Sequence, residues 1–176
     1  MVARGDLLEN SLARYNIPVH AWRQADIAAM GVAGTAGDHF ADEATNVLLL
    51  KGNTPSSSTV TDISWLQFTM PTEYVGGGDV RFAVTISVNA ASDSNTVDLS
   101  VYRQDPLLGT VGADICATDA GTVTATVQVI TFVITAASLA PGDIINLKLT
   151  TVNNDADGSD GIASIFTTAL LLDVKG

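Results

Sequence analysis

The sequence predicts an all-β protein: an antiparallel β-sandwich, jelly-roll-like, of about eight strands, with an extended N-terminal arm. From Asn46 to Val174, apolar and polar residues alternate over short segments, and Gly, Asn, Asp or Pro turns close nearly every segment. Charged residues make up only 15% of the chain, against about 25% in ordinary domains. Much of the polar surface must therefore be Thr, Ser, Asn and Gly, which suits β-strands.

Residues 1–42 lack this alternation and are predicted to form the N-terminal arm, with the sandwich over residues 43–176. The segment DLLENSLARY favours a turn or two of helix. The segment YNIPVHAW is typical of an extended chain, in which Pro18 argues against a central strand. Two interpretations stay open: an arm that packs on a neighbouring subunit, or an edge strand and long loop of the same sandwich.

The strands of the sandwich follow from the alternation, in chain order. They are expected at residues 46–51, 59–70, 80–90, 96–104, 114–117, 121–136, 144–152 and 162–174. Residues 80–90 and 144–152 alternate most regularly. In residues 121–136 the large apolar positions change phase near Val129, which predicts a β-bulge.

The charge balance argues against nucleic-acid and membrane partners. Eight Lys and Arg against 19 Asp and Glu give a net charge of -11, whereas a phosphate binder needs several cationic contacts. No apolar run reaches the roughly 18 residues of a membrane span. The N-terminus has no apolar signal-peptide core, so synthesis in the cytoplasm is expected. Cys116 is the only cysteine, which excludes an internal disulfide and favours a small buried apolar role.

The segment NNDADGSDG is a candidate calcium loop. Asn153, Asp155 and Asp157 fall at every second position, and Asp160 follows, so several oxygen ligands come from one tight turn. The Glu that an EF-hand needs at its twelfth place is absent. The alternative is a solvated acidic hairpin turn, and on that interpretation the protein has no cofactor.

No cluster of residues predicts a catalytic centre, so we expect no enzyme. Neither His20 nor His39 is accompanied by a Gly-x-Ser-x-Gly elbow. A carboxyl pair for glycoside hydrolysis would come from acids such as Asp38, Asp42 and Glu43. These acids lie in or beside the irregular arm, where solvation is favoured over a tuned pair.

Four aromatic residues, Trp22, Trp65, Tyr74 and Tyr102, are candidates for a sugar-binding platform like that of small β-sandwich lectin modules. Aromatic content is only 6%, and Trp65 lies in an apolar segment, which favours core packing or an intersubunit anchor for it. Tyr102 lies opposite the apolar face of its strand and is the best exposed candidate.

Five short segments are distributed over most of the chain: ARGDLL, NIPVHAWR, MPTEYVGGGDV, LAPGDIINLKLTTVNND and LLLDVKG. With them the chain resembles structural proteins of tailed-bacteriophage virions, among them capsid decoration (cement) proteins. The resemblance implies a jelly-roll or sandwich domain, often trimeric, that sits on the head surface and clamps subunits of the major capsid protein. It implies no catalytic residues.

Two functions of different classes are therefore predicted. The first is a non-enzymatic virion protein that cements the capsid surface as a homotrimer, through many modest contacts that add up. Its partner contact is expected in the arm, at Tyr15, Ile17, Val19 and Trp22. The alternative is a carbohydrate-binding module or adhesin on a tail fibre or head surface, with an exposed aromatic row.

Overall fold

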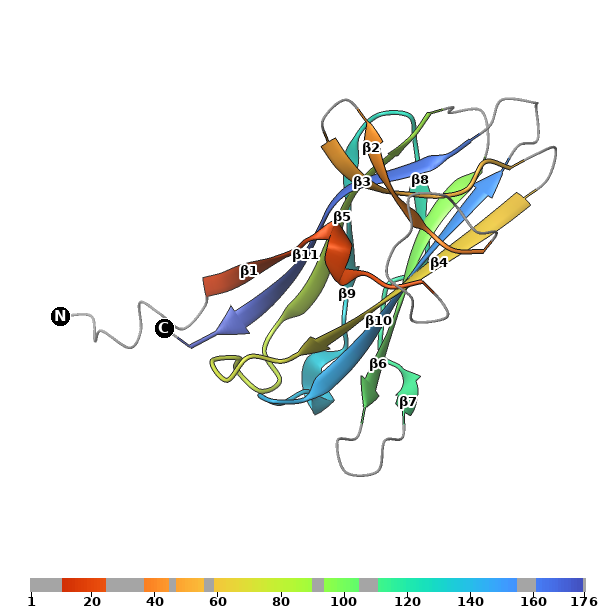
Figure 1. Cartoon of the computed structure of the whole chain (residues 1–176). Coiled ribbons are helices and arrows are strands. Elements are labelled where there is room, and N and C mark those ends of the chain that lie inside the picture. The colour runs from red at the N-terminus through yellow and green to blue at the C-terminus, as the bar shows by residue number, and fades with distance from the viewer. Residues whose placement is uncertain are drawn as a thin grey trace.

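The computed structural model describes residues 11–24, 37–44, 47–55, 59–89, 94–104, 111–154 and 161–175 (Figure 1). These residues form eleven strands and two short 3₁₀ helices, η1 (Val19–Ala21) and η2 (Ala136–Ser138). The strands are β1 (Ser11–Ile17), β2 (Phe40–Ala44), β3 (Val47–Lys51), β4 (Thr59–Thr69), β5 (Val80–Val88), β6 (Asn95–Gln104), β7 (Val111–Asp114), β8 (Gly121–Val123), β9 (Gln128–Val133), β10 (Ile144–Asn154) and β11 (Ala163–Val174). Within the described part of the chain, no helix has the length and apolar character needed to cross a membrane.

The strands pair into two antiparallel sheets that face each other, so the predicted β-sandwich is confirmed. Sheet A has the order β2-β3-β11-β5-β9, and β1 pairs with β11 on the same side as β3. Sheet B has the order β4-β10-β6-β7, and β8 also pairs with β6. Strand β10 lies between β4 and β6 and pairs with both along most of its length.

The inner faces of the two sheets form one hydrophobic core. The alternation predicted for residues 144–152 is confirmed, because every second residue of β10 is buried. In β5 every second residue is buried as predicted, and Ala83 and Ser87 on the other face are buried as well. Fully burying one such side chain contributes about 1.5–3 kcal/mol. The core residues of β5, β6 and β10 are Val80, Phe82, Val84, Ile86, Val88, Val97, Leu99, Val101, Ile145, Leu147 and Leu149.

The single strand predicted at residues 121–136 is two strands on different sheets. Strand β8 pairs with β6 in sheet B, and β9 pairs with β5 in sheet A. The chain therefore crosses between the sheets at residues 124–127, where a bulge near Val129 was expected. Gln128 holds this crossing, because its Nε2 donates to the Thr122 carbonyl at 2.7 Å and its Oε1 accepts from the Thr124 hydroxyl at 2.9 Å.

The chain from β1 to Gln24 runs along one side of the sandwich. Strand β1 pairs with β11 over seven residues, so the helical turns expected in this segment do not occur from Ser11 onward. After η1, Arg23 exchanges two backbone hydrogen bonds of 2.8 Å with Trp65 of β4. The edge-strand interpretation therefore describes Ser11–Ile17. Residues 1–10 and 25–36 lie outside the described residues, and the boundary after residue 42 stays a prediction.

Candidate functional site

The solvent-facing side of sheet B collects the outward residues of three strands; we call it the sheet B face. In β4, β10 and β6, alternate residues point into the core and their neighbours point outward. The register aligns the outward residues in rows across the three strands. The two central rows are Gln67, Asn146, Tyr102 and Trp65, Lys148, Ser100.

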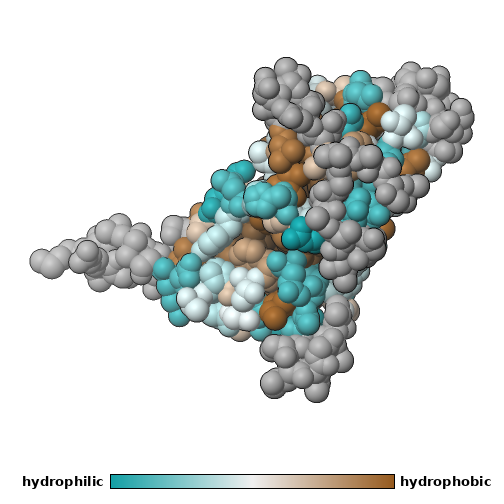
Figure 2. Space-filling view, viewed as in Figure 1, coloured by the Kyte–Doolittle hydropathy of each residue, from teal (hydrophilic) through white to brown (hydrophobic). Residues whose placement is uncertain are grey.

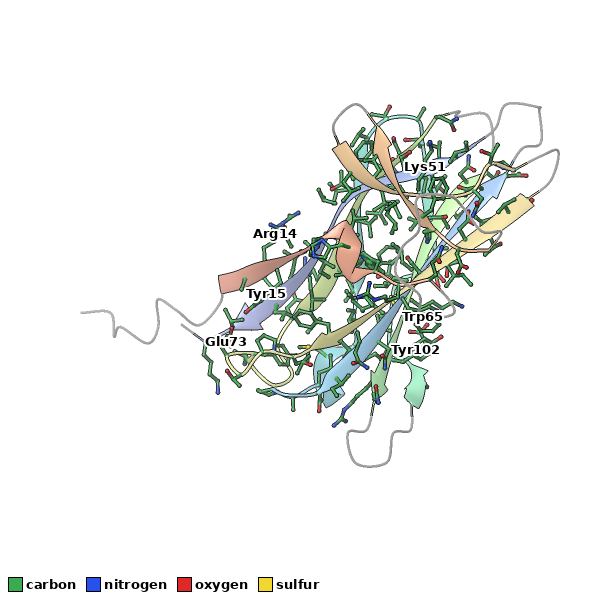
Figure 3. All side chains as sticks on the ribbon, viewed as in Figure 1. Arg14, Tyr15, Lys51, Trp65, Glu73 and Tyr102 are labelled. Carbon is green, nitrogen blue, oxygen red and sulfur yellow. The ribbon has the colours of Figure 1, made fainter. Side chains whose placement is uncertain are left out.

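An aromatic pair lies at the centre of this face. Trp65 on β4 and Tyr102 on β6 flank β10, and their rings meet above it with centroids 6.2 Å apart and planes tilted by 32° (Figure 3). The Lys148 ammonium lies over the Trp65 ring, 6.0 Å from its centroid. Two half-buried rings and a cation thus share one surface.

An amide row lies next to the aromatic pair. Gln67 Nε2 donates to Asn146 Oδ1 at 3.2 Å and to Gln104 Oε1 at 3.1 Å. Asn146 Nδ2 donates to the same Gln104 oxygen at 3.3 Å. Each primary amide has two donors and one acceptor oxygen, so the row retains capacity to bind hydroxyl groups of a ligand.

Trp65 is not a core residue, and the core-packing expectation for it is wrong. The inward residues of β4 are Asp62, Ser64 and Leu66. Asp62 is buried because the Asn53 backbone and the Asn153 side chain donate to its carboxylate, each at 2.8 Å. These partners lie after β3 and in β10, outside β4, so the sequence of β4 alone did not identify its inward face.

Of the other platform candidates, Tyr102 lies on the solvent-facing side as expected. Trp22 and Tyr74 are buried at 1% and 0% exposure and belong to the core. Lys148 and the three amides were not among the candidates predicted from the sequence. The alternation of β10 places Lys148 and Asn146 on its outward side, so this pattern could have identified them.

The residues expected to contact a partner are built into the sandwich. Ile17 and Trp22 are buried. The Trp22 indole donates to the Thr168 hydroxyl at 3.2 Å, and its ring meets Phe82 edge-on at 6.0 Å. The apolar surface of Ile17 and Trp22 is therefore covered by this chain itself.

Tyr15 and Val19 are half-buried and also pack on the core. The Tyr15 ring meets Phe68 edge-on at 6.0 Å, and its hydroxyl donates to Glu73 Oε1 at 2.8 Å (Figure 3). Tyr15 therefore links β1 to the turn after β4, at a distance from the sheet B face.

Most of the candidate calcium loop lies outside the described residues, including Asp155, Asp157 and Asp160. Asn153 is fully buried; its Nδ2 donates to Asp62, and its Oδ1 accepts from the Ala163 backbone at 3.0 Å. Calcium binding by the loop stays a prediction, and Asn153 already has partners at both ends of its amide.

His39 and Asp62 lie in the interior and are closed to a substrate. Burial lowers the pKa of His39 to about 3, which keeps the imidazole neutral, and its Nε2 lies 2.9 Å from the Thr151 hydroxyl. Burial raises the pKa of Asp62, although hydrogen bonds from Asn53 and Asn153 oppose this shift. This buried polar cluster joins Gly37–His39, β4 and β10.

The other candidates for chemistry do not converge. His20 is exposed on η1, and Asp38 bridges to Ile63 of β4. The side chains of Asp42 and Glu43 lie outside what the structure describes. Cys116 is half-buried against the core, and burial raises the pKa of its thiol.

No protein-family model and no curated protein matches the sequence. Among solved structures, the chain is similar to a xylan-binding module, CBM15, with a TM-score of 0.53 at 12% identity over 94% of this chain and 100% of that one. It is similar to TmCBM61, solved in complex with β-1,4-galactotriose, with a TM-score of 0.52 at 10% identity over 88% and 90%. It is also similar to a family 30 carbohydrate-binding module from a Clostridium thermocellum cellulosomal cellulase, with a TM-score of 0.50 at 16% identity over 90% and 97%.

The fold is shared with carbohydrate-binding modules. At these identities the likeness is one of fold, and it overturns the resemblance to phage decoration proteins. The predictions of a major capsid protein partner and of a capsid-bound homotrimer depended on that resemblance, and they are wrong. The phrases that carried the resemblance, such as LAPGDIINLKLTTVNND, encode a turn and a regular strand (β10), a pattern common to many β-sandwiches.

Proposed function

We propose that this chain is a carbohydrate-binding module that holds a neutral polysaccharide on the sheet B face. The observation that carries the proposal is the Trp65–Tyr102 pair, which lies beside the amide row on the solvent-facing side. The xylan-binding module and the galactotriose complex with the same fold support this choice of ligand class.

The chemistry of the face suits a sugar chain. A pyranose ring has apolar C–H faces, which pack on aromatic rings, and hydroxyl groups at its rim, which need donors and acceptors. Trp65 and Tyr102 supply the rings, and Gln67, Asn146 and Lys148 supply polar groups within the same two rows. The ligand would run across the strands and cover both rings.

We propose that the module acts by binding alone. Glycoside hydrolysis uses two carboxyl groups roughly 5–10 Å apart on either side of the bond. Among the outward residues of β4, β6 and β10, Asp98 is the single carboxylate. Asp114 of β7 pairs with Tyr102, and its Oδ1 already accepts from the backbone N–H groups of Val101 and Cys116 at 2.8 and 2.9 Å. The outward residues of β4, β6 and β10 therefore offer surface and hydrogen bonds for a glycan, with Asp98 as their one carboxylate.

Titration calorimetry with soluble xylan, xylohexaose and β-1,4-galactotriose tests the proposal. We expect saturable binding of at least one ligand, and we expect Trp65→Ala and Tyr102→Ala each to weaken it by about tenfold or more, as for a central aromatic contact. Tyr15→Phe is the matched control, because Tyr15 lies away from this face. Circular dichroism of each variant confirms that it is folded.

Two results would contradict the proposal. One is the absence of binding to a broad panel of neutral polysaccharides. The other is binding that Trp65→Ala and Tyr102→Ala leave unchanged. Release of reducing sugar from these polysaccharides would contradict the binding-only part.

A further inference from the structure

A hollow of about 750 Å³ lies on the opposite sheet, beside β11. Two strands share one edge of β11: β3 pairs at Ser164 and Ile165, and β1 pairs from Thr168 onward. Phe166 and Thr167 fall between them, where the register with β5 also shifts. The break between β3 and β1 therefore opens the sheet edge, and Figure 2 shows hydrophilic side chains over β1 and η1 next to hydrophobic ones toward β3.

The described walls of the hollow combine apolar side chains, polar side chains and one arginine. Leu48, at 50% exposure, and the half-buried Phe166 supply apolar surface. Arg14, Asn16 and His20 supply polar groups from β1 and η1. Among the described residues that line the hollow, none is acidic, although the chain has a net charge of -11.

Arg14 has spare binding capacity. Within the described residues its guanidinium makes one side-chain hydrogen bond, from Nε to Asn16 Oδ1 at 2.9 Å. The four N–H groups on its two terminal nitrogens remain, and they match a carboxylate in a two-point contact. The contact with Asn16 orients the guanidinium at the wall.

We propose that this hollow is a second carbohydrate site that takes an acidic sugar, a hexuronate residue. Its carboxylate binds Arg14, and its ring packs on Phe166 and Leu48. The volume lies in the range of about 300–1,000 Å³ that is usual for small-ligand pockets. The site goes beyond the proposed function, because it lies on sheet A and selects a charged ligand.

The test is calorimetric titration with trigalacturonate and, as the matched ligand, its methyl ester, which lacks the charges. We expect trigalacturonate to bind and the ester to bind at least about tenfold more weakly. We expect Arg14→Gln to weaken the binding of trigalacturonate by roughly tenfold or more, and Phe166→Ala to weaken it by a similar factor. Raising the salt concentration should weaken the binding of trigalacturonate to the native protein, because the ion pair of Arg14 with the sugar carboxylate is exposed to solvent.

The control variant is Arg81→Gln, since Arg81 is another exposed arginine on sheet A but lies outside the hollow. Any of four results would overturn the proposal. Trigalacturonate does not bind, or the methyl ester binds equally well. Alternatively, Arg14→Gln leaves the affinity unchanged, or Arg81→Gln lowers it as much as Arg14→Gln does. Tighter binding of benzoate than of trigalacturonate would also overturn the proposal, because it would indicate a site for apolar acids.

The two sites fail separately. Trp65→Ala should leave trigalacturonate binding unchanged, and Arg14→Gln should leave xylohexaose binding unchanged. Loss of xylan binding with intact trigalacturonate binding would remove the proposed function and leave the second site.

Discussion

Trp22 and Trp65 show how position in the sheet decides the role of one residue type. Trp22 is buried against Phe82 and hydrogen-bonded to Thr168, whereas Trp65 lies half-buried on the sheet B face. We expect Trp22→Ala to lower the free energy of unfolding by about 3–5 kcal/mol, because it opens a large cavity. Trp65→Ala is the matched control and should cost clearly less. Urea unfolding measures both, and equal losses would contradict the assignment of Trp22 to the core.

His39 is expected to make stability depend on pH. Its pKa is about 3 in the folded protein and 6.5 in the unfolded chain. Below pH 6.5 the histidine is therefore protonated in the unfolded chain but stays neutral in the folded protein. The free energy of unfolding consequently falls as the pH drops. Between pH 6 and 5 this contribution approaches about 1.4 kcal/mol per pH unit.

The measurement is urea unfolding of the native protein and of His39→Gln from pH 7.5 to 5. The difference between them isolates His39 from the nearby carboxyls, including Asp62, whose raised pKa acts in the opposite direction. We expect the slope to flatten in His39→Gln and to persist in His20→Gln, which changes the exposed histidine. An unchanged slope in His39→Gln would show that His39 is solvated.

At the scale of elements, Gly52 allows the end of β3 to approach β4 and β10. A methyl group at Gly52 would collide with the Asn153 amide and lie 2.9 Å from Asp62 Oδ2. Asn153 cannot move freely, because it bonds both Asp62 and the Ala163 backbone. We expect Gly52→Ala to lower stability by about 1–3 kcal/mol. Gly76→Ala, where the nearest atom is 3.8 Å away, should be nearly neutral in thermal unfolding. An unchanged unfolding temperature in Gly52→Ala would show that the contact of Gly52 with Asn153 and Asp62 can widen without a loss of stability.

The strands that the sequence predicted well are those with a hydrophobic period of two and partners on both sides. Strands β5, β6 and β10 follow from alternation alone. The split of residues 121–136 did not follow, because residues 124–127 contain no Gly, Pro, Asn or Asp. Hydrogen bonds of Thr124 and Gln128 make this turn instead, and such contacts are invisible in a propensity pattern.

The candidate site was predictable in part. The outward side of β6 was clear, so Tyr102 was correctly placed. In β4, apolar residues occur at both parities, and the buried partners of Asp62 decide which side faces inward. The outward position of Trp65 therefore depends on contacts that Asp62 makes with Asn53, which follows β3, and with Asn153 of β10. Neither residue belongs to β4.

At the scale of the whole molecule, the sandwich separates two surfaces of different character. The sheet B face carries two aromatic rings, three amides and Lys148, and suits a neutral glycan. Among its described lining residues the hollow beside β11 has Arg14 and no acidic side chain, and we propose it for an anionic glycan. Because the core lies between the sheets, we expect the two proposed sites to be independent, so that xylohexaose and trigalacturonate bind without competition.

The most direct test of the central claim is backbone amide chemical-shift mapping by NMR during titration with xylohexaose and with β-1,4-galactotriose. We predict saturable shifts centred on Trp65, Tyr102 and Asn146, extending along β4, β10 and β6, with the amides of β1 and β9 unmoved. Shifts centred on sheet A, or no saturable shifts with either sugar, would contradict the account.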